Sequence, residues 1–134
     1  MSAQVDRRKH LLEAIGKVGA ESLPSRQLDD TFKHEGNRHW FSNLKHAEEE
    51  YLLHARLRRD AFGNVQGGGP DTIAEGLMAS HEAVMREAIA EILFDADEAG
   101  RIVNAFVTLV RKVFGLPEPS ANKSRARGFW NRWR

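Results

Sequence analysis

Cysteine is absent from this chain of 134 residues. Its absence excludes disulfides, thiolate nucleophiles and zinc sites built on cysteine. The chain also has no apolar run near the roughly 20 residues that cross a bilayer. Charged side chains at Asp6, Arg7 and Arg8 are followed by no apolar stretch of signal-peptide length. These absences predict a cytoplasmic protein without a transmembrane segment.

Signatures of catalysis are missing as well. The sequence has no serine nucleophile elbow, no Walker-type phosphate loop and no paired-carboxylate motif. Three consecutive glycines do occur at residues 67–69, but no Walker lysine accompanies them and no strand is expected before them. We therefore expect a protein that is not an enzyme and needs no cofactor. The glycine-rich segment Gly63–Pro70 is expected to be a hinge.

Helical spacing dominates the apolar residues, and no stretch shows sustained two-residue alternation. Apolar side chains make up 41% of the chain and charged ones 29%, which suits a folded core rather than a disordered chain. The pattern predicts an all-α, single-domain bundle of about five helices over residues 1–117. Residues 118–134 are expected to form a basic-aromatic tail.

Five groups of apolar residues at helical spacing indicate where the five helices are expected. The apolar stripes are, in chain order, Val5, Leu11, Leu12, Ile15 and Val18; then Leu28 and Phe32; then Trp40, Leu44, Ala47, Tyr51, Ala55, Arg58 and Phe62, widened by Phe41, Leu52 and Leu57; then Ile73, Leu77, His81, Val84, Met85, Ala88, Ile92 and Leu93; and finally Ala99, Ile102, Val103, Phe106, Val110, Val113 and Phe114.

Capping residues place the ends of these helices. Gly19 is expected to end the first helix, and Ser25 to cap a second that continues through Lys33. The third runs from Asn37 to about Phe62, and the fourth begins at a capping box, Thr72–Glu75. Gly115 followed by Pro117 ends the fifth.

Charge is distributed unevenly along the chain. Net charge is +1 over residues 1–63, −4 over residues 64–115 and +4 over residues 116–134. The surplus in the tail favours an acidic or anionic partner, whereas the neutral body argues against a surface coated in basic charge for nucleic acid.

The tail combines arginine with aromatic residues. Four arginines, a lysine, two tryptophans and a phenylalanine fall within its last 13 residues. Tryptophan and arginine dominate many protein interfaces, and they also suit nucleic acids and anionic membrane surfaces. We expect a non-catalytic accessory subunit or regulator that docks onto a partner protein or nucleoprotein assembly. The expected contacts are Lys123, Arg125, Arg127, Phe129, Trp130, Arg132, Trp133 and Arg134.

Two other arrangements stay open for the chain as a whole. In the first, Trp130 and Trp133 fold back and cover the open end of the bundle, since exposed tryptophans are costly to leave in water. In the second, the chain associates with copies of itself. Composition does not discriminate between these arrangements and partner docking.

The start of the third helix supports an alternative function, a helix-turn-helix regulator that reads DNA. Its first turns carry polar and basic side chains that suit base edges and phosphates: Arg38, His39, Ser42, Asn43, Lys45 and His46. Against this function, Asp29 and Asp30 would lie near the phosphates, and three glutamates follow at residues 48–50.

Histidines and carboxylates support a second alternative, a helical-bundle metalloprotein. His46, Glu50 and His54 are spaced by four residues, so they share one side of the third helix and would be the ligands. The Glu-x-x-His motif of di-iron bundles is missing, and no mirrored pair appears on another helix. The sequence therefore commits to no metal ligand.

Residues 95–102 resemble the opening half of an EF-hand calcium loop. Asp95, Asp97, Gly100 and Ile102 fit that pattern. Ala99 and Phe106 occupy positions that need oxygen ligands, so useful calcium affinity is not expected. A helix cap at Asp95 or Asp97 is the preferred interpretation.

Overall fold

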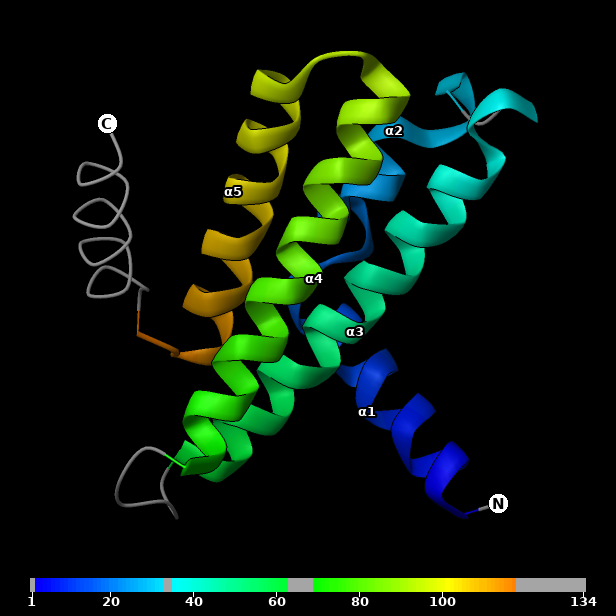
Figure 1. Ribbon diagram of the computed structural model, residues 1–134. Helices are drawn as coiled ribbons and strands as arrows, with labels where there is room; N and C mark the ends of the chain where they lie inside the picture. Colours follow the sequence, from blue (N-terminus) through cyan, green and yellow to red (C-terminus); the bar gives the residue numbers. More distant parts are fainter. Residues whose placement is uncertain (1, 33–34, 63–68, 118–134) are drawn as a thin grey trace, which may run out of the picture.

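The computed structural model describes residues 2–32, 35–62 and 69–117, and these residues form a bundle of five α-helices without strands (Figure 1). The helices are α1 (Ser2–Val18), α2 (Pro24–Phe32), α3 (Arg38–Phe62), α4 (Gly69–Leu93) and α5 (Ala96–Phe114). Short 3₁₀ helices at Ala20–Ser22 and Glu35–Asn37 flank α2. The predicted all-α bundle is confirmed.

The longest helices, α3 and α4, form the centre of the bundle. They run antiparallel. His54 of α3 contacts His81 of α4. Arg58, one turn later on α3, contacts Glu75, which comes six residues before His81 on α4. Helix α5 packs against α4, and α1 and α2 pack mainly against α3 (Figure 1). Side chains from two distant parts of the sequence therefore meet along the α3–α4 seam.

Large apolar side chains fill the space between these helices. Phe41, Tyr51, Met78, Met85 and Phe106 are almost completely buried, with exposed fractions of 2% or less. Each such side chain contributes about 1.5–3 kcal/mol when it leaves water. Tyr51 and Phe106 join α3 to α5 through tilted rings whose centroids are 5.9 Å apart.

Both ends of α5 follow the sequence prediction. The Asp95 carboxylate accepts a hydrogen bond from the Glu98 backbone N–H at 3.0 Å, which caps the helix. At the other end, Gly115 adopts the left-handed conformation with φ 67°. The Leu116 N–H then donates to the Arg111 carbonyl at 2.8 Å, which completes a Schellman motif.

The prediction for the start of α2 is wrong. The helix begins at Pro24, so Ser25 lies inside its first turn rather than before it. The cap comes from another helix: the Glu48 carboxylate on α3 accepts from the Ser25 N–H at 2.5 Å and from the Ser25 hydroxyl at 2.7 Å. A carboxylate suits this place, because a helix N-terminus presents free N–H groups.

The start of α4 also differs from the expectation. Gly69 and Pro70, expected to end a hinge, instead begin α4. Proline is tolerated there because N–H groups in the first turn of a helix need no intrahelical acceptor. The rest of the expected hinge, residues 63–68, and the tail, residues 118–134, lie outside the described residues. Every helix in the described part of the chain is too short or too polar to span a bilayer.

Some residues of the predicted apolar stripes face water. Exposed fractions are between 39% and 66% for Leu12, Leu57, Ile73, Leu77 and Val84. The buried face of α4 is instead centred on Met78, Met85 and Ile89. The reason is that α3 and α4 carry apolar residues on more than one side, and only neighbouring helices determine which side is covered.

Candidate functional site

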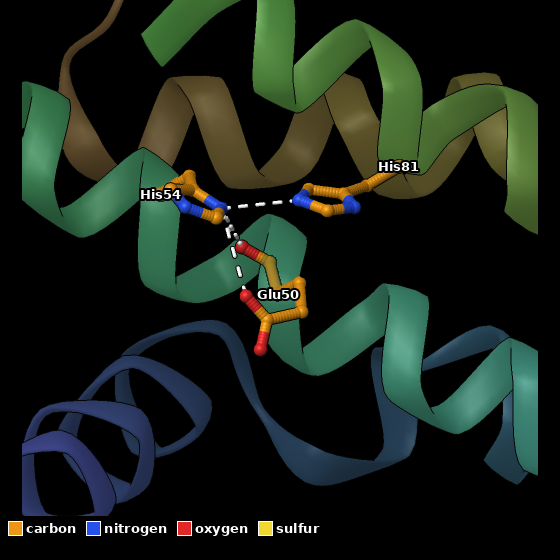
Figure 2. Close-up of side chains that lie close together, drawn as sticks. All are labelled: Glu50, His54 and His81. Atoms are coloured by element: carbon orange, nitrogen blue, oxygen red, sulfur yellow. Dashed lines mark hydrogen bonds and ion pairs between the residues drawn. The ribbon is translucent and has the colours of Figure 1, made fainter.

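The strongest candidate site lies on the α3–α4 seam, where two histidines meet (Figure 2). His54 on α3 and His81 on α4 approach with their rings nearly parallel, at 16°, and their centroids 5.0 Å apart. The His54 Nδ1 and His81 Nε2 atoms are 3.1 Å apart. Glu50, one turn before His54, points its carboxylate toward the same place (Figure 2).

The hydrogen bonds of His54 assign its tautomer. The His54 Nδ1 atom lies 2.8 Å from the Glu50 backbone carbonyl, which can only accept. The proton is therefore placed on Nδ1 of His54, which donates to that carbonyl and also faces His81 Nε2. His81 Nε2, 3.1 Å from that N–H, is then unprotonated and accepts through the lone pair that a metal ion would use.

An arginine from α1 meets the other side of the Glu50 carboxylate. Arg7 forms an ion pair with Oε1 of Glu50. The second oxygen, Oε2, lies 3.9 Å from His54 Nδ1. Because the Glu50 side chain is only 14% exposed while Arg7 is 55% exposed, the pair lies at the edge of the seam. One carboxylate oxygen thus stays directed at the histidines.

Burial keeps both histidines neutral. Partial burial lowers the pKa of His54 because it disfavours the charged imidazole, and the nearby positive charge of Arg7 lowers this pKa further. Partial loss of water also lowers the pKa of His81, followed by the charges of His54 and His46. At neutral pH the imidazoles consequently have lone pairs rather than extra protons.

The three side chains have the donor types and spacing of a transition-metal site. One ligand atom from each of Glu50, His54 and His81 lies within 4.8 Å of the others. In a tetrahedral zinc site, bonds of about 2.1 Å place neighbouring ligand nitrogens roughly 3.4 Å apart. The 3.1 Å between His54 and His81 is already close to that value. To bind an ion through Nδ1, His54 would carry its proton on Nε2 instead, and the Glu50 carboxylate, whose Oε2 lies 3.9 Å from His54 Nδ1, would move closer.

Sequence reasoning identified only part of this cluster. The metalloprotein alternative names His46, Glu50 and His54 on α3; Glu50 and His54 lie in the cluster, whereas the His46 side chain is exposed and lies outside it. His81 was assigned to the apolar stripe of α4. The spacing of residues along one helix cannot identify a ligand on another, and His81 has no local signal that separates it from a core histidine.

The expected DNA-reading residues share one property in the structure. Arg38, His39, Ser42, Asn43, Lys45 and His46 are all exposed on the first turns of α3. Exposure is necessary for reading a groove but does not test it, so DNA binding stays a prediction. The eight expected contact residues of the tail, Lys123 to Arg134, lie outside the described residues, and their role also stays a prediction.

A second polar feature surrounds Glu48, which is 2% exposed. A cavity of about 190 Å³ opens beside it, lined also by Ile15, Leu23 and Lys45. Burial raises the pKa of Glu48 to about 7, although the two hydrogen bonds from Ser25 oppose this shift. Since both oxygens already accept from Ser25, this carboxyl serves as a cap, and the histidine cluster is the better candidate for a ligand site.

Comparison with known proteins adds no assignment. The chain matches no protein-family model, no curated protein and no solved structure.

Proposed function

We propose that this protein is a helical metal-binding protein that holds one divalent transition-metal ion between α3 and α4. The supporting observation is the convergence of one carboxylate and two neutral imidazoles, from Glu50, His54 and His81, within 4.8 Å. The proposal departs from the sequence-based expectation of a protein without a metal ligand. The sequence could not show that His81 lies opposite His54.

The donor set favours a transition-metal ion such as zinc over calcium and magnesium. Two imidazole nitrogens and one carboxylate oxygen suit zinc, whereas calcium and magnesium prefer oxygen ligands throughout. Copper and nickel also bind imidazole. For the same ligands, divalent copper generally binds more tightly than nickel or zinc. Zinc is the ion to test first, with copper and nickel as competitors.

Calorimetric titration of the metal-stripped protein with zinc chloride tests the proposal. The protein must carry no polyhistidine tag, because such a tag would bind the same ion. One ion per chain is expected for the natural sequence. Replacement of both cluster histidines, His54→Ala with His81→Ala, should abolish this binding while the far-ultraviolet circular dichroism stays helical.

A matched control separates the cluster from histidine content in general. His39 is also on α3 and is exposed, but its ring packs beside Trp40 rather than in the cluster. The His39→Ala variant should bind zinc as the natural chain does. Equal binding by the His54→Ala, His81→Ala double variant would refute the proposed site.

Partner docking through the tail remains a second candidate function. It is supported by the composition of residues 122–134, with four arginines and two tryptophans, and by the +4 net charge of residues 116–134. Deletion of residues 122–134 should abolish capture of the partner in co-purification from the native cell. Helical circular dichroism should survive the deletion, and unchanged capture would refute docking through the tail.

A further inference from the structure

The outer side of α4 exposes apolar side chains to water. Ile73, Leu77 and Val84 are 66%, 40% and 39% exposed. They are separated by four and seven residues, so they follow one side of the helix. Beside them, a methyl group added at Gly76 would meet no atom within 4 Å, so the helix surface is open there. Among the described residues, no helix covers this side of α4.

Leu57 of α3 widens this apolar surface. It is 48% exposed and follows His54 by three residues. Leu77 precedes His81 by four residues, and the two histidines are in contact. Because α3 and α4 run antiparallel, these two steps lead in the same direction, toward the end of the bundle where α3 and α5 end and α4 begins (Figure 1). The four exposed side chains, Leu57, Ile73, Leu77 and Val84, are called the apolar face below.

The described chain ends close to the apolar face. Arg111 of α5 donates to the Pro117 carbonyl at 2.7 Å, and the same guanidinium pairs with Glu75 of α4. Ile73 and Leu77 are each two residues from Glu75, on the opposite side of the helix. Pro117 and the apolar face therefore lie on two sides of the same helical turns.

The tail is long enough to pass from one side of α4 to the other. An extended chain spans about 3.3 Å per residue, so the 12 residues from 118 to 129 reach up to about 40 Å. Half the way around a helix about 10 Å wide is roughly 16 Å. The aromatic residues that begin at Phe129 can therefore reach the apolar face with chain to spare.

Charge on α4 complements the tail. Glu87 and Glu91 are exposed and follow Ile73 by 14 and 18 residues, which places them on the same side of the helix. Arg86, a cation close to them in sequence, donates instead to Glu82 and Asn104. Net charge is −4 over residues 64–115 and +4 over residues 116–134. A second copy that paired through this side of α4 would bring together two segments of like net charge, whereas the tail brings the opposite charge.

We propose that residues 118–134 dock on the apolar face of their own chain. The aromatic residues of the tail cover the four exposed apolar side chains, and its arginines lie near Glu87 and Glu91. Aromatic side chains bury roughly 150–250 Å² each, so the three in the tail match an apolar patch of a few hundred Å². This contact keeps Trp130 and Trp133 out of water. A partner that binds the tail must then compete with α4 for it.

A spin label in the tail tests this contact on the full-length, metal-stripped chain. The natural sequence has no cysteine, so Ala126→Cys provides one attachment site for a nitroxide. The label should broaden the amide nuclear magnetic resonance signals of Ile73, Leu77 and Val84, and reduction of the label with ascorbate should restore them. The signal of Leu12, which is 58% exposed on α1, should stay sharp.

Two double variants, each made in the labelled chain, separate the apolar face from apolar exposure in general. Ile73→Lys with Leu77→Lys removes apolar area and adds positive charge, so broadening at Val84 should be lost. Leu12→Lys with Phe94→Lys makes the same charge change at two other exposed apolar positions and should keep the broadening. Far-ultraviolet circular dichroism should stay helical in both, because all four positions are exposed.

A mixed sample identifies which chain supplies the tail. One half carries the nitroxide without nitrogen-15, and the other half carries nitrogen-15 without the nitroxide. Signals of α4 should stay sharp in this mixture. Broadening there would mean that the tail docks on a second copy, which would overturn docking within one chain. Sharp α4 signals in the chain that carries both labels, or broadening that survives Ile73→Lys with Leu77→Lys, would overturn the contact itself.

Discussion

Two polar clusters join α3 to α4, and they differ in whether they can bind a further ligand. Near the start of α4, the Glu75 carboxylate forms ion pairs with Arg58 of α3, at 2.6 Å, and with Arg111 of α5. Farther along the seam, Glu50 faces His54 and His81. In each cluster one carboxylate faces two nitrogen-bearing side chains from the packed helices, and at Glu50 an arginine from α1 joins them.

The difference lies in the nitrogen donors. Guanidinium groups only donate, so the carboxylate of Glu75 is matched by permanent cations and no lone pair is left for a metal. Arg111 also donates to the Pro117 carbonyl at 2.7 Å, which ties the end of α5 to this cluster. Neutral imidazoles keep a lone pair. The arginine cluster is therefore a closed structural element, and the histidine cluster can accept a ligand.

Removal of Glu75 should produce the largest effect on stability. Arg58 and Arg111 are 8% and 3% exposed, so Glu75→Ala would leave two buried cations without this shared partner. Loss of one member of a buried ion pair costs about 3–5 kcal/mol in free energy of unfolding. Urea denaturation of Glu75→Ala and Glu50→Ala would compare the two clusters. An equal cost for both variants would contradict the distinction drawn between them.

Glu48 extends the comparison to a buried carboxyl whose hydrogen-bond donor is a serine rather than an arginine. Its pKa rises from 4.5 to about 7 on folding because burial penalises the charged form. Its contribution to stability is therefore fully present below pH 4.5 and is lost as the pH rises through 7, by about 3 kcal/mol at most.

The Glu48→Gln variant isolates this contribution, because it replaces the titrating group with an amide of similar size. Urea denaturation from pH 4 to pH 8 would give the free energy of unfolding of both proteins. Between pH 4.5 and pH 7, that of the natural protein should fall relative to that of the variant. Parallel curves over that interval would show that Glu48 does not titrate there.

Zinc should stabilise the protein through the histidine cluster alone. At a free concentration one hundred times the dissociation constant, a ligand that binds only the folded state adds about 2.7 kcal/mol. Thermal unfolding of the natural chain should therefore shift upward with zinc. The His54→Ala, His81→Ala variant should not respond, whereas Glu75→Gln should respond even though it starts from a lower stability. Zinc-induced stabilisation of the double variant would locate the ion elsewhere.

The smallest expected effect belongs to the ion pair between Arg7 and Glu50. The Arg7 side chain is 55% exposed, and surface ion pairs contribute about 0–1 kcal/mol. Arg7→Gln should therefore change the free energy of unfolding by less than about 1 kcal/mol, measured by urea denaturation beside Arg8→Gln as an exposed control. A loss comparable to that of Glu75→Ala would mean that α1 depends on this contact far more than its exposure indicates.

Local signals in the sequence predicted the helices well. Gly115 with φ 67° ends α5 as expected, since glycine is the residue that best tolerates this conformation. Asp95 caps the same helix as expected, because its acceptor is three residues away along the chain. Such features depend on neighbours in sequence, and apolar spacing of three and four depends only on the helix itself.

Long-range features were predicted poorly for a physical reason. The cap of α2 comes from Glu48, 23 residues away from Ser25, so local capping rules could not find it. Leu57 and Leu77 belong to apolar stripes yet remain 48% and 40% exposed. The spacing of apolar residues shows that a helix has an apolar side. It does not show which part of that side a neighbouring helix covers.

The amino-acid sequence by itself determined that this chain is helical, where several helices end, and that His46, Glu50 and His54 share one side of α3. Only the tertiary structure decided that His81 lies opposite His54 and that Glu75 lies between two arginines. Local preferences act over one helical turn, whereas a site on two helices depends on how both are rotated and aligned. That alignment is set by packing of the whole core, through Tyr51, Met85 and their neighbours.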